Sequence, residues 1–412
     1  MNSKLKRGFA ALAVTASSAM ILSSCAAPSF DAANCTDAAL SVGSLLPTTG
    51  NLAFLGAPEI AGVDLAIKEI NEAGGVAGKC VSVSHKDSGD TTTDIATQSS
   101  TALINDGVDA IVGAASSGVS LSVIDQITGA GVLQISPANT APDLSTYADG
   151  GLYFRTAPSD VLQGRVLGNL MVGDGASNVA FLTLQDPYGT GLFENAKIAV
   201  EAAGGTVVAN EEFAPGTKNF SSQIDKVLAA KPDAIAVISF DEVKSILPEL
   251  VKVKGFAASK VYLVDGNVAN YSADFTDFSI EGAQGTIPGV VATDEIKAKF
   301  LAVNPDLTDF SYAAESYDAT ILVALAAIAG GAADGATIKA NLKAVSEGGE
   351  KVTDFATAVQ MLKDGKDIDF DGLSGPITFD DNGDPTEAYV GIYKFNADNT
   401  NTATKSEYGK ID

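Results

Sequence analysis

Short apolar segments alternate with amphipathic segments along most of the chain, and this alternation predicts strands and helices in turn. The apolar segments are four to eight residues long, as is typical of buried strands. The first series predicts strands at 39–46, 80–86, 109–112 and 132–135, separated by helices at 58–73, 92–105 and 119–128. Such an order favours right-handed βαβ units and a parallel sheet covered by helices on both faces.

A second series repeats the pattern after residue 160. It predicts helices at 161–172, 190–203, 219–230 and 243–253, and strands at 178–183, 206–209, 234–239 and 260–264. Further helices follow at 294–303, 312–329, 336–345 and 355–362, and we expect them to pack back onto the first domain. Strands at 375–379 and 388–395, around a tight turn at 381–384, complete the chain. The sequence therefore predicts an α/β fold with two doubly wound, parallel-sheet lobes.

The N-terminal segment has the pattern of a secretory signal. Three basic residues precede an uncharged, largely apolar run of 15 residues, Gly8–Leu22. That run is shorter than the ~20 residues that a membrane-spanning helix needs. The position of Cys25 resembles a bacterial lipobox, which implies a signal peptide at 1–24, lipidation of Cys25, and a lipidated tether at 25–36. An ordinary signal with an incidental cysteine is the alternative.

The chain is strongly acidic, and its charge limits the kinds of partner. The formal charge is −25, and removal of residues 1–24, which carry three positive charges and no negative ones, makes it −28. Such a charge argues against binding to nucleic acid, whose phosphates are neutralised by Lys and Arg. It also argues against adhesion to an anionic membrane, so a lipid anchor would have to provide the attachment.

Cysteine and histidine usage gives little support to catalysis. With Cys25 lipidated, Cys35 and Cys80 remain as an even pair in an oxidising compartment. They precede or open neighbouring strands at one sheet edge, which favours a disulfide; two unpaired buried thiols are the alternative. The single histidine has no nucleophile partner, so a hydrolase that uses Asp241 and Asp265 is the remaining enzyme hypothesis.

Two strand ends carry candidate ligand-binding groups, because ligands of open α/β sheets sit beyond the carboxyl ends of the strands. Residues 113–120 are small and rich in hydroxyls, and they lead into a predicted helix. A helix N-terminus with such residues suits a carboxylate, although N-capping uses the same residues. Asp265 ends an apolar strand, where an unpaired carboxylate is costly; a turn or cap role is the alternative.

Several motifs occur in the order found in one family of binding proteins. They are Pro47–Gly50, Ser136–Leu144, Tyr153–Asp160 with Gln163-Gly164, Asp186–Gly189, Asp265-Gly266 and Gly375–Asp380. In this order, across almost the whole mature chain, they resemble the leucine/isoleucine/valine-type (branched-chain amino acid) substrate-binding proteins of ABC transporters. The resemblance implies the type I periplasmic-binding-protein fold, with two lobes joined by a three-segment hinge.

The resemblance also implies roles for individual residues. Ser117 matches the serine that takes the ligand carboxylate. The carbonyl of Ala138 matches the group that accepts from the α-ammonium, and Thr140 matches a threonine that contributes further hydrogen bonds. Tyr188 matches the aromatic residue that closes over the ligand, and Asp265 matches an acidic group facing the ammonium.

The chain departs from the family pattern at three positions. Phe240-Asp241 stands where related amino-acid binders carry tyrosines, and Asn139 replaces a small apolar residue. The extra acid and amide would suit a more polar or cationic ligand, unless they face solvent. This departure concerns leucine-like specificity more than amino-acid binding.

The function that follows is capture of a small amino acid or related zwitterion, without chemistry and without cofactor or metal. Lobe I is expected at 37–157 and 289–374, and lobe II at 158–288 and 375–412, with hinge crossovers near Ala157, Pro288 and Gly375. The resemblance implies an extracytoplasmic, lipid-anchored monomer that docks on an ABC permease. A sensory binding subunit of the same fold, for amides or other small polar ligands, is the alternative.

Overall fold

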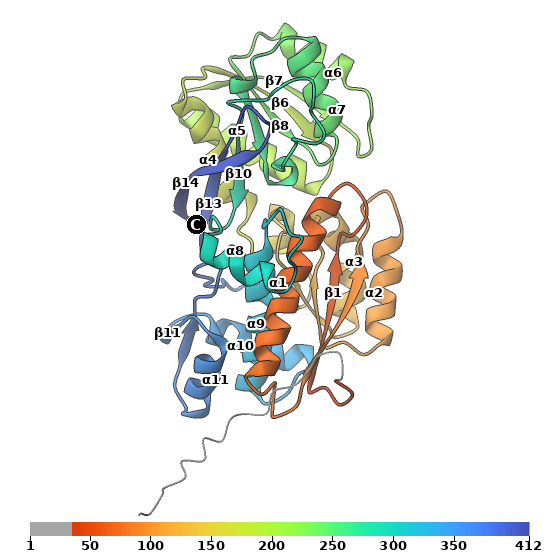
Figure 1. The fold of residues 1–412 in the computed structure, drawn as a ribbon, viewed down its shortest axis with the longest axis vertical. Coiled ribbons are helices and arrows are strands. Elements are labelled where there is room, and N and C mark those ends of the chain that lie inside the picture. The colour runs from red at the N-terminus through yellow and green to blue at the C-terminus, as the bar shows by residue number, and fades with distance from the viewer. Residues whose placement is uncertain (1–34, 412) are drawn as a thin grey trace, which may run out of the picture.

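The computed structural model describes residues 35–411 as two lobes stacked along the long axis of the molecule (Figure 1). Each lobe is built on its own sheet, and we call them lobe I and lobe II in chain order. The predicted signal peptide, the predicted lipidation site Cys25 and most of the predicted tether lie outside the described residues.

Lobe I is built on a five-stranded parallel sheet with the strand order β2-β1-β3-β4-β5. Its strands are β1 (Leu40–Leu46), β2 (Val81–Asp87), β3 (Ala110–Gly113), β4 (Leu133–Ser136) and β5 (Tyr153–Arg155). The helices that connect them are α1 (Ala53–Glu72), α2 (Ile95–Asn105) and α3 (Ser117–Gly129). This confirms the first βαβ series.

Lobe II is built on a seven-stranded sheet with the strand order β14-β13-β10-β9-β8-β6-β7. The parallel part comprises β6 (Asn178–Leu184), β7 (Thr206–Phe213), β8 (Ala234–Ile238), β9 (Val261–Val264) and β10 (Gln284–Pro288). Its helices are α4 (Asp160–Gly173), α5 (Pro187–Ala202), α6 (Ser221–Ala229) and α7 (Val243–Leu247), the last continued by a π-type turn at Pro248–Val253. The strands β13 (Glu387–Phe395) and β14 (Asn401–Lys410) extend the sheet in antiparallel pairing.

The late helices return to lobe I, as the sequence predicts. They are α8 (Asp294–Leu301), α9 (Ala313–Gly330), α10 (Gly335–Val345) and α11 (Phe355–Lys363), with a small parallel pair, β11 (Glu350–Val352) and β12 (Ile368–Phe370), between and after them. Side chains of α9, α10 and α11 share one hydrophobic core with β1, β3 and β4. Within residues 35–411, α9 is the one helix that is long and apolar enough to cross a membrane, but 83% of it is buried inside the protein.

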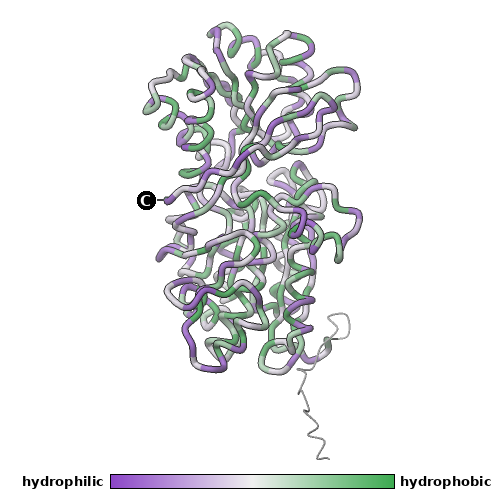
Figure 2. The backbone as a smooth tube through the Cα atoms, turned by 60° about the vertical axis from the view of Figure 1, so that its left-hand side comes forward, coloured by the Kyte–Doolittle hydropathy of each residue, from purple (hydrophilic) through white to green (hydrophobic). Residues whose placement is uncertain are grey.

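Apolar backbone segments concentrate inside the two lobes, and polar segments form most of the outer loops (Figure 2). The strand β14 is an exception to apolar patterning. Its sequence is largely polar and none of its residues is buried, so hydrophobic periodicity does not identify it. The helix α1 begins five residues before the predicted start and contains Pro58, which removes only one intrahelical hydrogen bond near the helix start.

Three segments connect the lobes: residues 156–159 (crossover 1), 289–293 (crossover 2) and 371–386 (crossover 3). The third differs from the sequence expectation, since 375–379 forms no sheet strand and only a single bridge from Phe379 to Pro385. Ile377 and Phe379 belong to the core of lobe I, where the Phe379 ring meets Phe154 edge-on at 5.3 Å. The chain therefore joins lobe II only near Ala388, rather than at Gly375.

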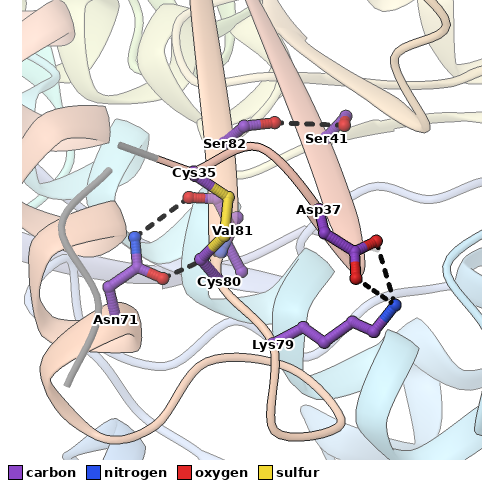
Figure 3. The surroundings of a disulfide bond; sticks show 8 residues. All are labelled: Cys35, Asp37, Ser41, Asn71, Lys79, Cys80, Val81 and Ser82. Carbon is purple, nitrogen blue, oxygen red and sulfur yellow. Dashed lines mark hydrogen bonds and ion pairs between the residues drawn. A yellow bond between two sulfur atoms is a disulfide. The ribbon is translucent and has the colours of Figure 1, made fainter. Parts of the chain in front are cut away.

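Cys35 and Cys80 form the predicted disulfide (Figure 3), with their Cα atoms 5.8 Å apart. Cys80 immediately precedes β2, at the end of the sheet remote from the carboxyl ends of the strands. Beside it, the Asn71 amide pairs with both the N–H and the carbonyl of Val81. The disulfide thus fixes the start of the described chain to the edge of lobe I.

Candidate functional site

A narrow cavity lies between the lobes, beyond the carboxyl ends of both sheets. Residues from lobe I, from lobe II and from the start of α9 line it, and all of them are buried. They are Leu52, Leu55, Ala115, Ser116, Ser117, Ala138, Tyr188, Phe240, Asp265, Gly266 and Tyr312. Leu52, Leu55, Ala115 and Ala138 of lobe I share a hydrophobic cluster with lobe II residues, so the structure has the lobes closed on each other.

The lobe I wall is formed by the N-terminus of α3. Ser116 is the N-cap, and its side chain accepts from the N–H of Val119. Among the described residues, no hydrogen bond engages the N–H groups of Ser117 and Gly118. These free donors, together with the positive end of the helix dipole, make this wall suitable for an anionic group such as a carboxylate.

The Ser117 hydroxyl accepts hydrogen bonds from the N–H groups of Thr140 and Ala141, at 3.3 and 3.2 Å. It therefore ties the α3 N-terminus to the loop that follows β4. Ser117 and Ala138 both line the cavity, so the structure brings these two predicted site residues together.

The lobe II wall is formed around the carboxylate of Asp265, which is 5% exposed. Its Oδ1 accepts from the hydroxyl of Tyr188 at 2.7 Å and from Nε2 of Gln163 at 2.9 Å. Its Oδ2 accepts from the hydroxyl of Tyr312 at 2.7 Å. All three donors are neutral, and no ion pair within residues 35–411 involves Asp265.

Burial raises the pKa of Asp265 above its usual value, and the hydrogen bonds from its three donors oppose that rise. Burial, followed by the charge of Asp265, raises the pKa values of Tyr188 and Tyr312 well above the usual range. Both phenols therefore stay protonated and donate. The nearest fully buried arginine, Arg155, is bound to Asp384 at 2.7 and 2.6 Å and is not free to neutralise Asp265. The wall thus presents a negative charge that lacks a cation.

Two aromatic rings form the floor of the lobe II side. Tyr188 and Phe240 stack with 5.3 Å between ring centroids and 12° between ring planes. The Tyr188 hydroxyl also accepts from the N–H of Gly266 at 3.3 Å. The stack holds the phenol against Asp265 and gives the cavity an apolar surface.

Three predicted residues, Asn139, Thr140 and Asp241, do not line the cavity. The Asn139 amide donates to the carbonyl of Ala115 at 2.7 Å and accepts from the hydroxyl of Tyr153 at 2.9 Å, so it is engaged within lobe I. Thr140 is buried, and its carbonyl accepts from the N–H of Asp160 at 2.7 Å.

Asp241 is exposed on lobe II and pairs with Lys244 at 2.8 Å. Asp241 therefore faces solvent, which is the alternative to a ligand-binding role.

Sequence reasoning did not find Leu52, Leu55, Gln163 or Tyr312. The two leucines lie at the start of α1, which the sequence placed later in the chain. Gln163 belongs to a recognised motif, yet its contact with Asp265 depends on the packing of α4 against β10. Tyr312 precedes α9 with a left-handed backbone (φ 59°), and only the tertiary fold brings it to the cavity.

Comparison with known proteins agrees with this architecture. A family model described as periplasmic binding protein matches residues 39–400. The chain belongs to the periplasmic binding protein family. This binding protein is 27% identical, over 361 residues, to the Leu/Ile/Val-binding protein BraC3 of Rhizobium johnstonii, covering 87% of this chain and 92% of that protein. It is also 27% identical to the chemotactic signal transduction system substrate-binding protein BasB of Halobacterium salinarum, covering 85% and 86% of the two chains.

Among solved structures, this binding protein resembles LivJ of Streptococcus pneumoniae, a branched-chain amino acid transporter substrate-binding protein crystallised with isoleucine. The TM-score is 0.73 at 24% identity, covering 90% of this chain and 99% of LivJ. At that identity the likeness shows the fold, which is the type I periplasmic-binding fold. The family is one of substrate-binding proteins rather than enzymes. Within residues 35–411, no group of three or more His, Cys, Asp or Glu side chains is arranged to hold a metal ion.

Proposed function

We propose that this binding protein captures a small amino acid, of the branched-chain or a closely related type, between its two lobes. The observation that carries the proposal is Asp265, a buried carboxylate with three neutral donors and no cationic partner within residues 35–411. A ligand ammonium supplies the missing cation and forms charge-assisted hydrogen bonds to it. The ligand carboxylate binds at the N-terminus of α3, on the opposite wall.

Two features support an amino acid over a simple amine or a simple acid. One wall of the cavity offers the free N–H groups of the α3 N-terminus to an anion, and the other wall carries the Asp265 carboxylate. This arrangement matches a zwitterion in orientation as well as in charge. Between them lie Leu52, Leu55 and the Tyr188–Phe240 stack, which suit an apolar side chain. BraC3 is named for leucine, isoleucine and valine, and LivJ holds isoleucine.

Capture and closure are one event in this account. The ligand contacts residues of both lobes, so it binds the closed form more tightly than the open form and shifts the equilibrium toward closure. The closed form then docks on the permease of an ABC importer. Lipidation of Cys25 would keep the receptor at the membrane, with residues 25–36 as the tether.

Calorimetric titration with leucine, isoleucine, valine, threonine and alanine tests the proposal, using protein from residue 35 onward. We expect at least one to bind with a dissociation constant in the micromolar range or tighter. Folded protein that binds none of the five, nor any other amino acid in a full panel, would overturn the proposal.

A sensory role is a second candidate, favoured by the relative BasB, whose name places it in chemotactic signal transduction. The ligand site would be the same, and only the partner of the closed form would differ. Deletion of the gene separates the two roles. Loss of uptake of the labelled ligand supports transport, whereas intact uptake with loss of chemotaxis toward it supports sensing.

A further inference from the structure

The first turns of α9 contact the ligand cavity and two of the three crossovers. Tyr312 donates to Asp265 across the cavity at 2.7 Å. In crossover 1, the Thr156 hydroxyl donates to the backbone carbonyl of Glu315 at 2.9 Å. In crossover 2, Gly289 lies so close to the Glu315 carboxyl group that a Cβ there would stand 1.9 Å from Oε1. Relative movement of the lobes therefore changes the surroundings of Glu315.

Crossover 3 is attached one turn further along the same helix. The Asp318 carboxylate accepts from the N–H groups of Leu373 and Ser374 at 2.8 and 2.7 Å. A Cβ at Gly372 would stand 1.8 Å from Asp318 Oδ1. The beginning of α9 thus contacts all three crossovers and the ligand cavity, so it couples the hinge to the cavity.

A second carboxyl group faces this turn from α1. Glu59 is fully buried, and neither of its carboxyl oxygens has a hydrogen-bond partner among the described residues. The helices touch closely beside it, since a Cβ at Gly62 would stand 2.2 Å from the carbonyl oxygen of Ala313. Glu315, the acidic side chain whose charge acts on Glu59, is only 4% exposed. Two ionised carboxylates that interact inside the protein are costly.

The groups that face Glu315 from neighbouring elements are few. Asp318 lies one turn away on α9, and its charge acts on Glu315. Lys297, Asp309 and Tyr393 share with Glu315 the lining of a hollow of about 480 Å³ between residues 308–315 and the β13–β14 strands. Lys297 lies 5.8 Å over the ring of Phe310 and forms no ion pair with Glu315.

The hollow spans the two lobes beside crossover 2, and it lies next to Glu315. Separation of the lobes widens it and brings water to the Glu315 carboxyl group, whereas Glu59 stays inside lobe I.

The protonation of this pair follows from its burial. In the closed structure, burial raises the pKa of Glu315 to about 8, and the charge of Asp318 adds to the rise. Burial also raises the pKa of Glu59 well above its usual value, with Glu315 as the second cause. In an open form with a hydrated Glu315, the pKa of that group returns toward its usual value of 4.5.

We propose that Glu315 takes up a proton when the lobes close, so that ligand capture is coupled to proton binding at Glu315. The link between proton uptake and ligand capture rests on the proposed function, because the ligand stabilises the closed form.

The sign of the effect follows from linkage. The closed form binds more protons than the open form, so lowering the pH favours closure. The gain begins as the pH falls below about 8 and is complete near the usual pKa of a glutamate. Within that range, ligand affinity rises by up to about tenfold for each unit by which the pH falls. A ligand α-ammonium does not titrate in this range and does not account for such a change.

Calorimetric titration with the tightest-binding amino acid of the panel tests the coupling. At pH 7, titrations in two buffers of different ionisation enthalpy give the number of protons taken up on binding. We expect the native protein to take up nearly one proton more than Glu315→Gln. Glu201→Gln, an exposed substitution on α5, serves as the control and should behave as the native protein does.

Closure can also be followed without ligand, which separates this inference from the proposed function. We expect small-angle X-ray scattering to give a smaller radius of gyration at pH 6 than at pH 8.5 for the native protein. Glu315→Gln should give the same radius at both values. Equal proton uptake by the native protein and by Glu315→Gln would overturn the inference. Equal radii of the native protein at the two pH values would do so even if no amino acid binds.

Discussion

The hydroxyl of Tyr312, at the start of a lobe I helix, donates to Oδ2 of Asp265, at the end of a lobe II strand, over 2.7 Å. Both residues are buried and line the interlobe cavity. This hydrogen bond exists only while the lobes are together, because its partners belong to different lobes. The group proposed to bind the ligand ammonium therefore also holds the closed form.

Removal of this bond should weaken ligand binding without harm to either lobe. A hydrogen bond to a charged group contributes about 1.5 kcal/mol or more, so Tyr312→Phe should lower affinity about tenfold. Tyr147→Phe is a matched control, since its hydroxyl binds Asp125 within lobe I at 3.1 Å. Calorimetry measures the ligand affinity of each variant. Equal affinities of the two variants would show that the Tyr312 contact does not stabilise closure.

Replacement of Asp265 by asparagine tests the charge itself. Asp265→Asn keeps the shape of the side chain and removes the negative charge, so binding of a zwitterion should fall at least tenfold, the scale of a lost charge-assisted hydrogen bond. Asp241→Asn removes an exposed charge from the same lobe and should leave affinity unchanged. Circular dichroism verifies that both variants fold. Unchanged affinity of the Asp265 variant would place that carboxylate outside the binding site.

Stability should depend strongly on the buried ion pair below the cavity. The Arg155 guanidinium is fully buried and bidentate on Asp384, and it also donates to the carbonyl of Ala141 at 2.9 Å. Arg155→Met leaves a buried carboxylate without its partner, which costs about 3–5 kcal/mol.

Urea unfolding followed by circular dichroism measures this loss. Lys343→Met is the control, because its partner Asp381 belongs to the same turn as Asp384 but is 95% exposed. No measurable change is expected for the control. A loss under 1 kcal/mol for Arg155→Met would contradict the structural role of the pair.

The disulfide should affect stability and leave ligand binding intact. It closes a loop with a sequence separation of 45 residues, for which chain entropy gives a stabilisation of about 4 kcal/mol. The double variant Cys35→Ser/Cys80→Ser should unfold at lower urea concentration. Its affinity for the ligand should stay native, because Cys80 lies at the opposite end of the sheet from the cavity. A loss of binding in folded double variant would contradict this separation.

The alternation of buried strands and amphipathic helices carried most of the fold prediction. Apolar runs such as Ala234–Ile238 and Val261–Val264 are completely buried, so their composition directly reflects their place in the sheet. The strand β14 was missed because its polar residues face solvent and its position depends only on pairing with β13. The strand predicted at 375–379 is absent, because this apolar segment packs on lobe I without joining a sheet. Crossover 3 therefore ends later than its predicted position near Gly375.

The candidate site was predictable where a residue directly ends a strand or begins a helix, as Asp265 and Ser117 do. Its neighbours were harder to assign, because consecutive loop residues point in different directions. Ala138 lines the cavity while the next side chain, Asn139, binds within lobe I. Tyr312 was not foreseeable, because a distant segment brings it to Asp265 only in the folded, closed protein.

The most direct test of the account is the affinity of the protein for leucine and for two leucine analogues, measured by calorimetry. 4-Methylpentanoate lacks the ammonium that Asp265 would bind, and leucinamide lacks the carboxylate that the α3 N-terminus would bind. We expect leucine to bind and each analogue to bind at least a hundredfold more weakly, a loss of about 2.7 kcal/mol. Binding of 4-methylpentanoate as tightly as leucine would contradict the account.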